Sequence, residues 1–351
     1  MKIGNKNVGG DHRVFIIAEV SSNHGKDINR AKKMIDVAAD AGADAVKFQL
    51  FIAEKISADT DDSRTIVSTP TFVKKPTKLI DLYRENEFPR KWLKELVAYA
   101  RAKKILFMAT PFDNEAVDLL EGVGAPAHKV ASYELLDVPL LRKIAGTRKP
   151  VIVSTGAATL GEVEYSIDVL TKAGAKDIVI LHCSSVYPTP PEHTNLKAIQ
   201  TLQSVFPEHI IGYSDHTLGI AIPITAVALG AKVIEKHFML DDGVHTVDDK
   251  FSLTPAELAQ MVSSIRMAEQ SFGSSRKAPS ILERNEKLKA RRSLWVIKDI
   301  KKGEKLTEKN IASLRPALGL SPMFYDLAIG ANASHSLKKG KPLEIGDVIQ
   351  K

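Results

Sequence analysis

The sequence contains a single cysteine, Cys183, among its 351 residues. One thiol cannot form a disulfide within the chain, so we expect a reducing compartment and a fold held by its apolar core. A chain of this length can bury enough apolar surface to be stable without cross-links. The first twelve residues lack the apolar core of a secretion signal, and no apolar run reaches the roughly 20 residues that span a bilayer. We therefore expect a cytoplasmic protein with no membrane association.

Aromatic residues are also few, at 6% of the chain, and the lysines behind the net charge of +7 are scattered rather than clustered. Nucleic-acid binding usually requires a basic patch, so we do not expect it. A hydrophobic content of 44% and a charged content of 26% are typical of a soluble globular protein. An anionic small substrate is compatible with this composition because it needs only a local basic pocket.

Short apolar segments alternate with segments of helical periodicity along the first three quarters of the chain. The expected strands are residues 14–20, 45–50, 105–110, 127–132, 151–155, 178–183, 210–215 and 233–238. The expected helices are residues 28–41, 90–103, 115–121, 139–144, 161–173, 196–206, 220–229 and 255–272. Repeated strand–helix units over this length predict an α/β fold, a (β/α)₈ TIM barrel, whose usual length is about 250 residues. The alternative is a doubly wound open sheet, which often has a glycine-rich loop after its first strand; residues 21–25 are not such a loop.

The C-terminal part of the chain has a different pattern. We divide the chain into a barrel at 1–272, a linker at 273–290 that begins GSSRKAP, and a small β-rich domain at 291–351. Within that domain residues 300–306 are echoed by residues 337–343, both built around Lys-Lys-Gly, which indicates internal pseudo-symmetry. A module of about 60 residues is marginally stable alone, so we expect it to dock on a barrel.

One connection between an expected strand and the next helix is unusually long, at about forty residues between positions 51 and 89. Loops of this length are usually lids or disordered segments. A loop that follows a barrel strand lies on the catalytic face. We therefore expect residues 51–89 to form a lid at the site.

Residues 210–240 carry the strongest pattern for a site. Two apolar runs end in Ser214-Asp215-His216 and in Glu235-Lys236-His237. Alternate strand residues share a face, so His216 and His237 point the same way from neighbouring strands, and Lys236 points to the helix layer. Two imidazoles suit a divalent metal with open positions for water and substrate. Each histidine alone is equally compatible with a structural role.

Every expected strand ends in polar residues, which face the active site in a (β/α)₈ barrel. They are Glu19, Lys47, Gln49, Thr110, Ser132, Glu134, Ser154, Thr155, His182, Ser184, Ser185, Ser214, His216, Glu235 and His237. Lys47, Lys129 and the hydroxyls suit a doubly anionic ligand, such as a phosphate ester with a carboxylate. Glu19 and Glu134 could move protons, although Glu19 could instead pair with Lys47 for structure alone. Lys129 and Ser132 differ in parity, so both line the site only if the strand end bends.

Short motifs in order along nearly the whole chain resemble the sialic acid synthase family. They are IAE at 17–19, NH at 23–24, KFQ at 47–49, TPF at 110–112, KVASYE at 129–134, STG at 154–156, HC at 182–183, YPTP at 187–190, SDHT at 214–217 and EKHF at 235–238. KDIKKG at 298–303 and LRP at 314–316 match the antifreeze-like (SAF) module of the same family.

The resemblance implies that phosphoenolpyruvate condenses with an N-acetylated aldose to give a nine-carbon 2-keto sugar acid, releasing phosphate by C–O cleavage. It implies that His216 and His237 hold Mn²⁺, with Mg²⁺ or Co²⁺ as alternatives, and that Glu19 is the acid or base near carbon 2. The implied phosphoenolpyruvate ligands are Lys47, Thr110, Lys129, Ser132, Ser154, Ser185 and Ser214. The implied sugar ligands are Gln49, Glu134, Tyr187, Asp248 and Arg315. The family forms homodimers with a swapped C-terminal module, so Arg315 would reach the partner's site.

Some residues depart from the sialic acid branch of this family. Ser185 stands where many sialic acid synthases have asparagine, and residues 243–247 lack the Gly-Pro that sialic and legionaminic acid types have before the residue matching Asp248. Residues 249–253 and 315–320 look more like pseudaminic acid synthases. We therefore expect that activity, with a di-acetamido, 6-deoxy hexose as acceptor.

Two alternatives remain at this stage. Sialic and legionaminic acid synthesis stay open because the acceptor sugars differ by small substituents, which a pocket distinguishes by only about 1–3 kcal/mol each. A non-catalytic carbohydrate-binding protein is a rival of another class. A binder of that kind needs neither a buried Lys47 nor paired histidines.

Overall fold

The computed structural model describes residues 1–349, and the chain divides into two compact units, Met1–Phe272 and Gly273–Lys351. Each unit has a hydrophobic core of its own. Within the described residues, no helix combines the length and the apolar character needed to cross a membrane.

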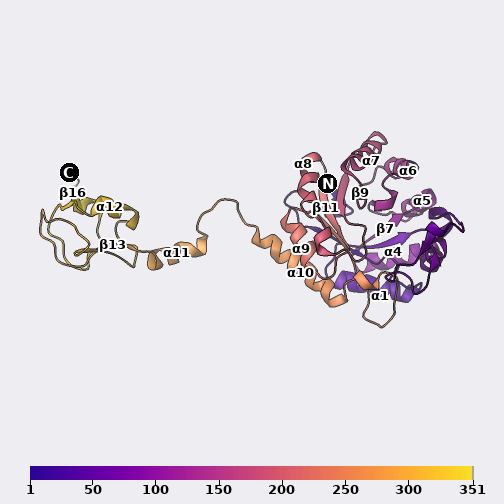
Figure 1. Cartoon of the computed structure of the whole chain (residues 1–351), viewed down its shortest axis with the longest axis horizontal. Helices are drawn as coiled ribbons and strands as arrows, with labels where there is room; N and C mark the ends of the chain where they lie inside the picture. The colour runs from indigo at the N-terminus through magenta and orange to yellow at the C-terminus, as the bar shows by residue number, and fades with distance from the viewer. Residues whose placement is uncertain (350–351) are drawn as a thin grey trace. The chain divides into compact units, whose positions relative to one another are not determined.

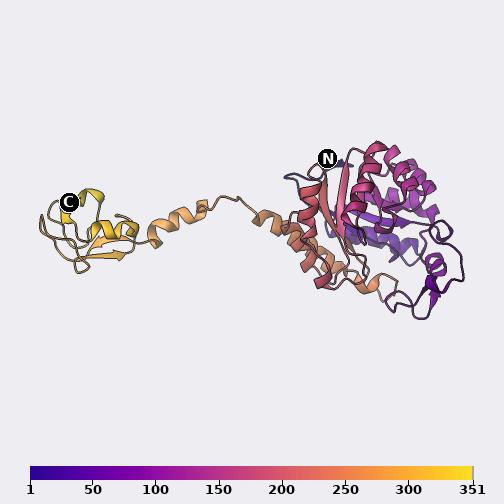
Figure 2. The same ribbon diagram turned by 45° about the horizontal axis from the view of Figure 1, so that its top comes forward.

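Eight parallel strands form the centre of the first unit (Figures 1 and 2). They are β3 (Phe15–Glu19), β4 (Ala45–Leu50), β7 (Leu106–Pro111), β8 (His128–Val130), β9 (Val151–Ser154), β10 (Ile178–Cys183), β11 (Ile210–Asp215) and β12 (Val233–His237). Their order is β7-β4-β3-β12-β11-β10-β9-β8, and the strands at the two ends of this order, β7 and β8, pack side by side. The sheet is therefore a near-closed TIM-like barrel, which confirms the expected fold class.

Helices surround these strands (Figure 2). They are α1 (Ile28–Asp40), α4 (Leu93–Ala102), α5 (Asn114–Gly122), α6 (Val138–Gly146), α7 (Leu160–Lys172), α8 (Ala198–Val205), α9 (Ala221–Ala228) and α10 (Pro255–Ser271). Local sequence defines their starts: Thr254 and Glu257 form a reciprocal capping box at the start of α10. The helices bury their apolar faces against the outward-facing strand residues in one large cluster.

The side chains inside the barrel are apolar towards the amino ends of the strands and polar at their carboxyl ends. Phe15, Ile17 and Val233 belong to the inner apolar cluster. A short hairpin of β1 (Lys2–Ile3) and β2 (Lys6–Asn7) contributes to the same cluster. Side chains alternate along a strand, so the next inward positions are Glu19 after Ile17 and Glu235 after Val233. The fold therefore directs the polar strand ends to one mouth of the barrel.

The long connection after β4 carries short elements of its own. They are α2 (Ala53–Ile56), β5 (Ile66–Val67), β6 (Thr77–Lys78) and α3 (Leu79–Asn86). Phe72 and Tyr83 of this segment line the cavity at the carboxyl ends of the barrel strands. The segment therefore lies on the catalytic face, where a lid was expected.

The second unit is built from short elements around a core of its own. They are α11 (Ile281–Ala290), β13 (Ser293–Val296), β14 (Ile311–Leu314), α12 (Tyr325–Ala328), β15 (Asn332–Ala333) and β16 (Val348–Ile349). β13 pairs with β14 and β15 with β16, both antiparallel. The sequence repeat has a structural counterpart, because Ile300 and Leu337, the first residues of the two copies, exchange backbone hydrogen bonds of 2.9 and 2.8 Å.

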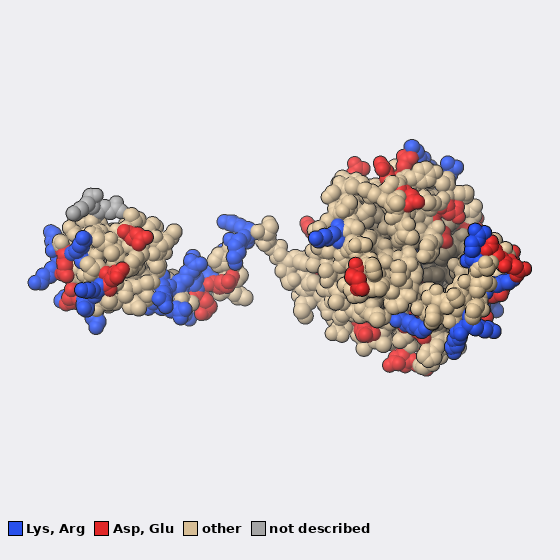
Figure 3. Space-filling view, viewed as in Figure 1, with Lys and Arg blue, Asp and Glu red and all other residues tan. Residues whose placement is uncertain are grey.

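Residues 281–290, which we expected to be linker, form helix α11. Ser280 and Glu283 cap its start, with Glu283 N donating to Ser280 Oγ at 3.2 Å and Ser280 N donating to Glu283 Oε2 at 2.7 Å. Basic side chains gather along this helix and its flanks (Figure 3). The Ser-x-x-Glu capping pattern at residues 280–283 is present in the sequence, but the prediction of a linker did not use it.

Candidate active site

The carboxyl ends of all eight barrel strands line a single cavity of about 520 Å³. The strand residues that line it are Glu19, Lys47, Gln49, Thr110, Lys129, Ser154, Cys183, Ser214, Glu235 and His237. Residues that follow the strands add Ser132, Ser185, Tyr187, His216 and Asp248. A cavity of this size fits a small-molecule substrate. The fold thus brings together most of the residues selected from the sequence.

Two lysines and two carboxylates form a buried charge cluster in this cavity. Lys47 Nζ lies 2.8 Å from Glu19 Oε2 and 3.6 Å from Glu235 Oε2. Lys129 Nζ lies 3.7 Å from Glu235 Oε1. All four side chains are at least 95% buried. Burying charges is costly unless they are paired, and here each lysine has a carboxylate beside it.

The pKa values of this cluster differ between the two carboxylates. Burial raises the pKa of Glu19 to about 7, although Lys47 opposes the shift. Burial acts in the same direction on Glu235, but Lys129 and Lys47 outweigh it and lower the pKa of that carboxyl. Glu235 is therefore the ionised partner of the lysines near pH 7. Glu19 can gain or lose a proton in the same range.

Hydroxyl groups surround the two ammonium groups. Lys47 Nζ donates to Thr110 Oγ1 at 3.1 Å, and Lys129 Nζ donates to Ser154 Oγ at 2.7 Å. Ser214 Oγ donates to Glu235 Oε1 at 3.1 Å. Paired ammonium groups with several hydroxyl donors suit a phosphate or carboxylate. The cavity therefore has the chemistry of an anion site.

Ser132 reaches this anion site because β8 ends at Val130 and a 3₁₀ turn, Ser132–Glu134, follows. Gly156 N donates to Ser132 Oγ at 3.0 Å. Ser185 Oγ is buried nearby and has no hydrogen-bond partner within residues 1–349. A buried hydroxyl without a partner is costly unless a ligand completes it. The hydroxyls of Ser132 and Ser185, which lie beside Gly156, are therefore positioned to bind a polar ligand in the cavity.

We expect Gly156→Ala to weaken binding of the doubly anionic ligand, which the resemblance implies is phosphoenolpyruvate, by about 10-fold or more while the barrel stays folded. A methyl group at this position would lie 2.1 Å from Ser185 Oγ and 2.8 Å from Ser132 Oγ, so both hydroxyls would have to move. Losing or misplacing such donors costs about 1–3 kcal/mol. The measurement is KM for phosphoenolpyruvate. Gly161→Ala is the matched control, because a methyl group there, in α7, meets nothing within 4 Å; equal KM values for the two variants would contradict the prediction.

His216 and His237 lie side by side at the cavity, with ring centroids 5.2 Å apart. His216 Nδ1 lies 2.8 Å from the Ser184 carbonyl oxygen, so Nδ1 donates and Nε2 keeps its lone pair. His237 Nδ1 is buried without a hydrogen-bond partner in the described part of the chain. Burial lowers the pKa of His216 to about 4 and that of His237 well below its ordinary value. Both rings are therefore neutral at pH 7.

These two neutral imidazoles fit a divalent metal held by few protein ligands. Imidazole nitrogens are ligands for divalent transition-metal ions. Among residues 1–349, no cluster of three or more histidine, cysteine, aspartate or glutamate side chains is arranged to hold a metal. Two protein ligands leave most positions for water or substrate, as in a catalytic site and unlike a closed structural site.

Comparison with known proteins agrees with this architecture. The model of the NeuB family matches residues 34–277, most of the barrel unit. The chain belongs to the NeuB family. A model of the SAF domain matches residues 291–349. The expected membership of the sialic acid synthase family is thus confirmed.

Several proteins are similar to this chain over most of its length. A pseudaminic acid synthase of Campylobacter jejuni is 41% identical over 351 residues, which are 99% of this chain and 99% of the relative. An N,N'-diacetyllegionaminic acid synthase of the same species is 43% identical over 329 residues, 93% of this chain and 98% of the relative. The structure of an N-acetylneuraminic acid (sialic acid) synthetase from Leptospira borgpetersenii, in complex with citrate, has a TM-score of 0.72 at 37% identity and covers 82% of this chain and 94% of that one.

Two residues selected as NeuB-family ligands do not line the cavity within this chain. Glu134 ends the 3₁₀ turn after β8 and is half-buried beside the cavity, and burial raises its pKa to about 7. Arg315 belongs to the second unit and is exposed there. Gln49, Tyr187 and Asp248, the other expected sugar ligands, do line the cavity.

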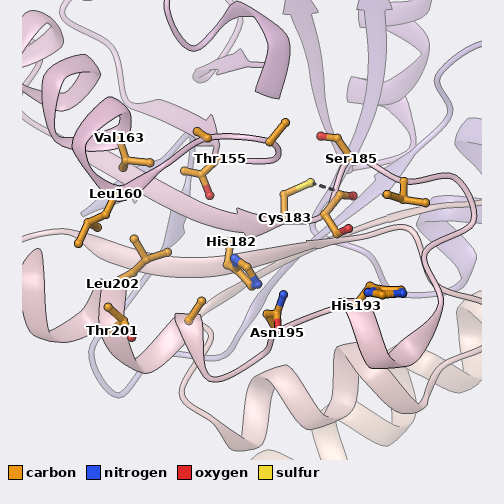
Figure 4. Close-up of a pocket in the computed structure, with 15 residues that line it drawn as sticks. Thr155, Leu160, Val163, His182, Cys183, Ser185, His193, Asn195, Thr201 and Leu202 are labelled. Atoms are coloured by element: carbon orange, nitrogen blue, oxygen red, sulfur yellow. Dashed lines mark hydrogen bonds between the residues drawn. The ribbon is translucent and has the colours of Figure 1, made fainter.

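Three polar residues at strand ends face a second cavity instead of the first. Thr155, His182 and Ser184 line a cavity of about 440 Å³ beside α7 and α8 (Figure 4). His182 Nε2 lies 2.7 Å from the Thr194 carbonyl oxygen. Their outward direction follows from strand alternation, because inward-facing Ser154, Cys183 and Ser185 are their neighbours in sequence. Expecting every polar strand end to face the active site was therefore wrong for these three.

Sequence reasoning noted Glu235 but gave it no role, although it contacts both lysines. The available signal was that Glu235 lies two residues before His237 and therefore points to the same face of the strand. Cys183 also lines the first cavity, with Sγ 3.8 Å from His216 Nδ1. Phe72 and Tyr83 of the long connection after β4 had no recognisable signal, because that connection has no periodicity that fixes the direction of its side chains.

Proposed function

We propose that the chain is a phosphoenolpyruvate-dependent synthase of nine-carbon 2-keto sugar acids, acting on a di-acetamido, 6-deoxy hexose as a pseudaminic acid synthase. The observation that carries the proposal is the buried cluster of Lys47, Lys129, Glu19 and Glu235 beside two neutral histidines. Phosphoenolpyruvate combines a phosphate and a carboxylate, which match the paired ammonium groups and their hydroxyls.

In this reaction carbon 3 of phosphoenolpyruvate forms a bond with the aldehyde carbon of the open-chain sugar. The aldehyde oxygen takes up a proton and becomes a hydroxyl. Water adds to carbon 2 and loses both of its protons as its oxygen becomes the 2-keto oxygen, and the bond between carbon 2 and the bridging oxygen breaks, which releases phosphate. Glu19 takes one proton of the added water, as its pKa of about 7 allows. Lys47, Lys129, Thr110, Ser132, Ser154, Ser185 and Ser214 hold the phosphate and the carboxylate. Gln49, Glu134, Tyr187 and Asp248 orient the sugar.

We propose that His216 and His237 hold the metal, Mn²⁺ foremost, with Mg²⁺ or Co²⁺ as substitutes. A bound divalent ion polarises the aldehyde oxygen as a Lewis acid. The two imidazoles are suited to this task because they are neutral and lie at the same mouth of the barrel as Lys47. Tyr187 packs on His216 with ring centroids 4.2 Å apart, which limits the movement of that imidazole.

A second candidate acceptor is the sugar of the legionaminic acid branch, because a relative named for that activity is 43% identical. Phosphate release from phosphoenolpyruvate with a panel of N-acetylated hexoses, without metal and with Mn²⁺, Mg²⁺ or Co²⁺ in turn, tests the proposal. We expect metal-dependent release, fastest with the di-acetamido, 6-deoxy hexose of pseudaminic acid synthesis. If no hexosamine supports release with any of the three metals, the proposal is wrong.

We propose a homodimer in which the SAF domain of one chain completes the site of its partner through Arg315. Arg315→Ala and Lys47→Met should each be nearly inactive as separate preparations. Co-refolded mixtures should recover up to about a quarter of wild-type activity, because half of the random dimers are hybrids with one intact site. No recovery in a mixture shown to contain hybrid dimers would mean that Arg315 acts within its own chain or not at all.

A further inference from the structure

A buried ion pair lies on the opposite face of β11 and β12 from the two histidines. Asp215 and Lys236 are directly opposed in the register of these strands. Lys236 Nζ lies 2.5 Å from Asp215 Oδ2, and neither side chain has exposed surface. Each residue is the chain neighbour of a histidine, since Asp215 precedes His216 and Lys236 precedes His237.

The same pair also anchors the residue that follows His216. Lys236 Nζ donates to the carbonyl oxygen of Thr217. Asp215 accepts from Thr217 N at 3.0 Å and from Thr217 Oγ1 at 3.1 Å. Every polar group of Thr217 is thus bound by Asp215 or Lys236. The backbone on both sides of His216 is therefore tied to the strand that carries His237.

Further contacts complete the support of His216 from the cavity side. Thr189 N donates to the His216 carbonyl oxygen at 2.9 Å, and the imidazole is held by the Ser184 carbonyl. The ammonium group of Lys236 adds a link to β12, because it binds Asp215 and Thr217, the residues on both sides of His216.

Stability alone is a poor explanation for this ion pair. A fully buried ion pair usually contributes little net stability compared with apolar side chains of the same volume. A pair of this kind can instead fix one geometry, and groups that hold metal ligands commonly raise metal affinity. We infer that Asp215 and Lys236 are positioning residues that set the distance between the imidazoles of His216 and His237 and so determine metal affinity. This inference rests on the metal site proposed above.

The test is Mn²⁺ affinity, measured from the electron paramagnetic resonance signal of free Mn²⁺ during titration of the full-length protein. Asp215→Asn/Lys236→Met removes both charges at nearly constant volume, and we expect its Kd for Mn²⁺ to rise about 10- to 100-fold. KM for phosphoenolpyruvate at saturating Mn²⁺ should stay close to the wild-type value, because Lys47 and Lys129 lie on other strands. A purely structural role would not separate these two quantities.

A second variant keeps the test informative if the double variant does not fold. Thr217→Val has the same shape as threonine and removes only the hydroxyl bond to Asp215, so we expect a smaller rise in Kd at an unchanged melting temperature. The control is Glu121→Gln/Lys149→Met, which removes a partly exposed pair 2.9 Å apart between α5 and the segment before β9. This control should bind Mn²⁺ like the wild type.

His216→Ala separates failure of this inference from failure of the proposed metal site. If His216→Ala binds Mn²⁺ as tightly as the wild type, the proposed metal site is wrong. If His216→Ala loses Mn²⁺ while the folded double variant or Thr217→Val keeps wild-type affinity, the positioning role of Asp215 and Lys236 is overturned and the metal site stands.

Discussion

Replacing Lys47 with methionine should reduce kcat/KM for phosphoenolpyruvate by about 10³-fold or more. Its ammonium group contacts Glu19, Glu235 and Thr110, and it would face the phosphate or carboxylate of the substrate. Truncating one member of a buried charge pair costs about 2–5 kcal/mol or more, and each 1.36 kcal/mol is a factor of ten in rate. Steady-state kinetics with varied phosphoenolpyruvate measures the loss.

The same variant should also be less stable, in a manner that depends on pH. Removing Lys47 leaves buried carboxylates without a partner, which costs about 3–5 kcal/mol when they are ionised. Burial raises the pKa of Glu19 from 4.5 to about 7 even with Lys47 present. Between these values the folded state holds a proton that the unfolded state has lost, so the unfolding free energy falls as the pH rises. We expect the deficit to be largest above pH 7 and to shrink towards pH 5.

Lys47→Met/Glu19→Gln separates the loss of stability from the loss of binding. Removing one uncompensated carboxylate should restore much of the unfolding free energy and remove most of the pH dependence. The double variant should remain inactive, because the cation for the substrate is still missing. A folded Lys47→Met protein with wild-type KM and kcat would contradict the role of Lys47 as an anion ligand.

Replacing His237 with alanine should lower kcat by about 10³-fold or more at saturating phosphoenolpyruvate. The proposed metal supplies several kcal/mol of charge stabilisation, and one remaining imidazole would hold it poorly. KM for phosphoenolpyruvate should change little, because the two lysines and their hydroxyls are intact. Phosphate release at several Mn²⁺ concentrations tests this split between kcat and KM.

His182→Ala is the matched control for His237→Ala. His182 is a half-buried imidazole at the end of β10, but it faces the second cavity and bonds to a carbonyl oxygen there. The His182→Ala variant should retain most of the wild-type activity and its dependence on metal. If both variants lose activity equally, the effect is a general one of losing an imidazole and the role of His237 is not supported.

The barrel was predictable because each strand is a compact apolar run bounded by turn residues. The rule that polar strand ends face the active site predicted the convergence of Glu19, Lys47 and Gln49, which the regular strands β3 and β4 bring to one cavity. That rule was wrong for Thr155, His182 and Ser184, which line the second cavity, because it ignored the alternation of side chains along a strand. Lys129 and Ser132 share the site only because the chain turns into a 3₁₀ helix after β8, as their difference in parity required.

Other parts of the site depend on contacts that lie outside local sequence patterns. Tertiary packing places Phe72 and Tyr83, from the long connection after β4, at the cavity. The charge cluster around Glu235 depends on the lateral spacing of four strands, which periodicity alone does not give. Arg315 belongs to a separate unit, so the role proposed for it could not be tested by the fold of the barrel unit.

The central claim is that the cavity lined by Lys47 and Lys129 binds phosphoenolpyruvate for condensation by C–O cleavage. The most direct measurement uses phosphoenolpyruvate labelled with ¹⁸O at the bridging oxygen, together with the accepted hexose and Mn²⁺. Mass spectrometry should find the label in the released phosphate and a nine-carbon 2-keto acid without it. Label retained in the sugar acid, or phosphate release without any new carbon–carbon bond, would contradict the account.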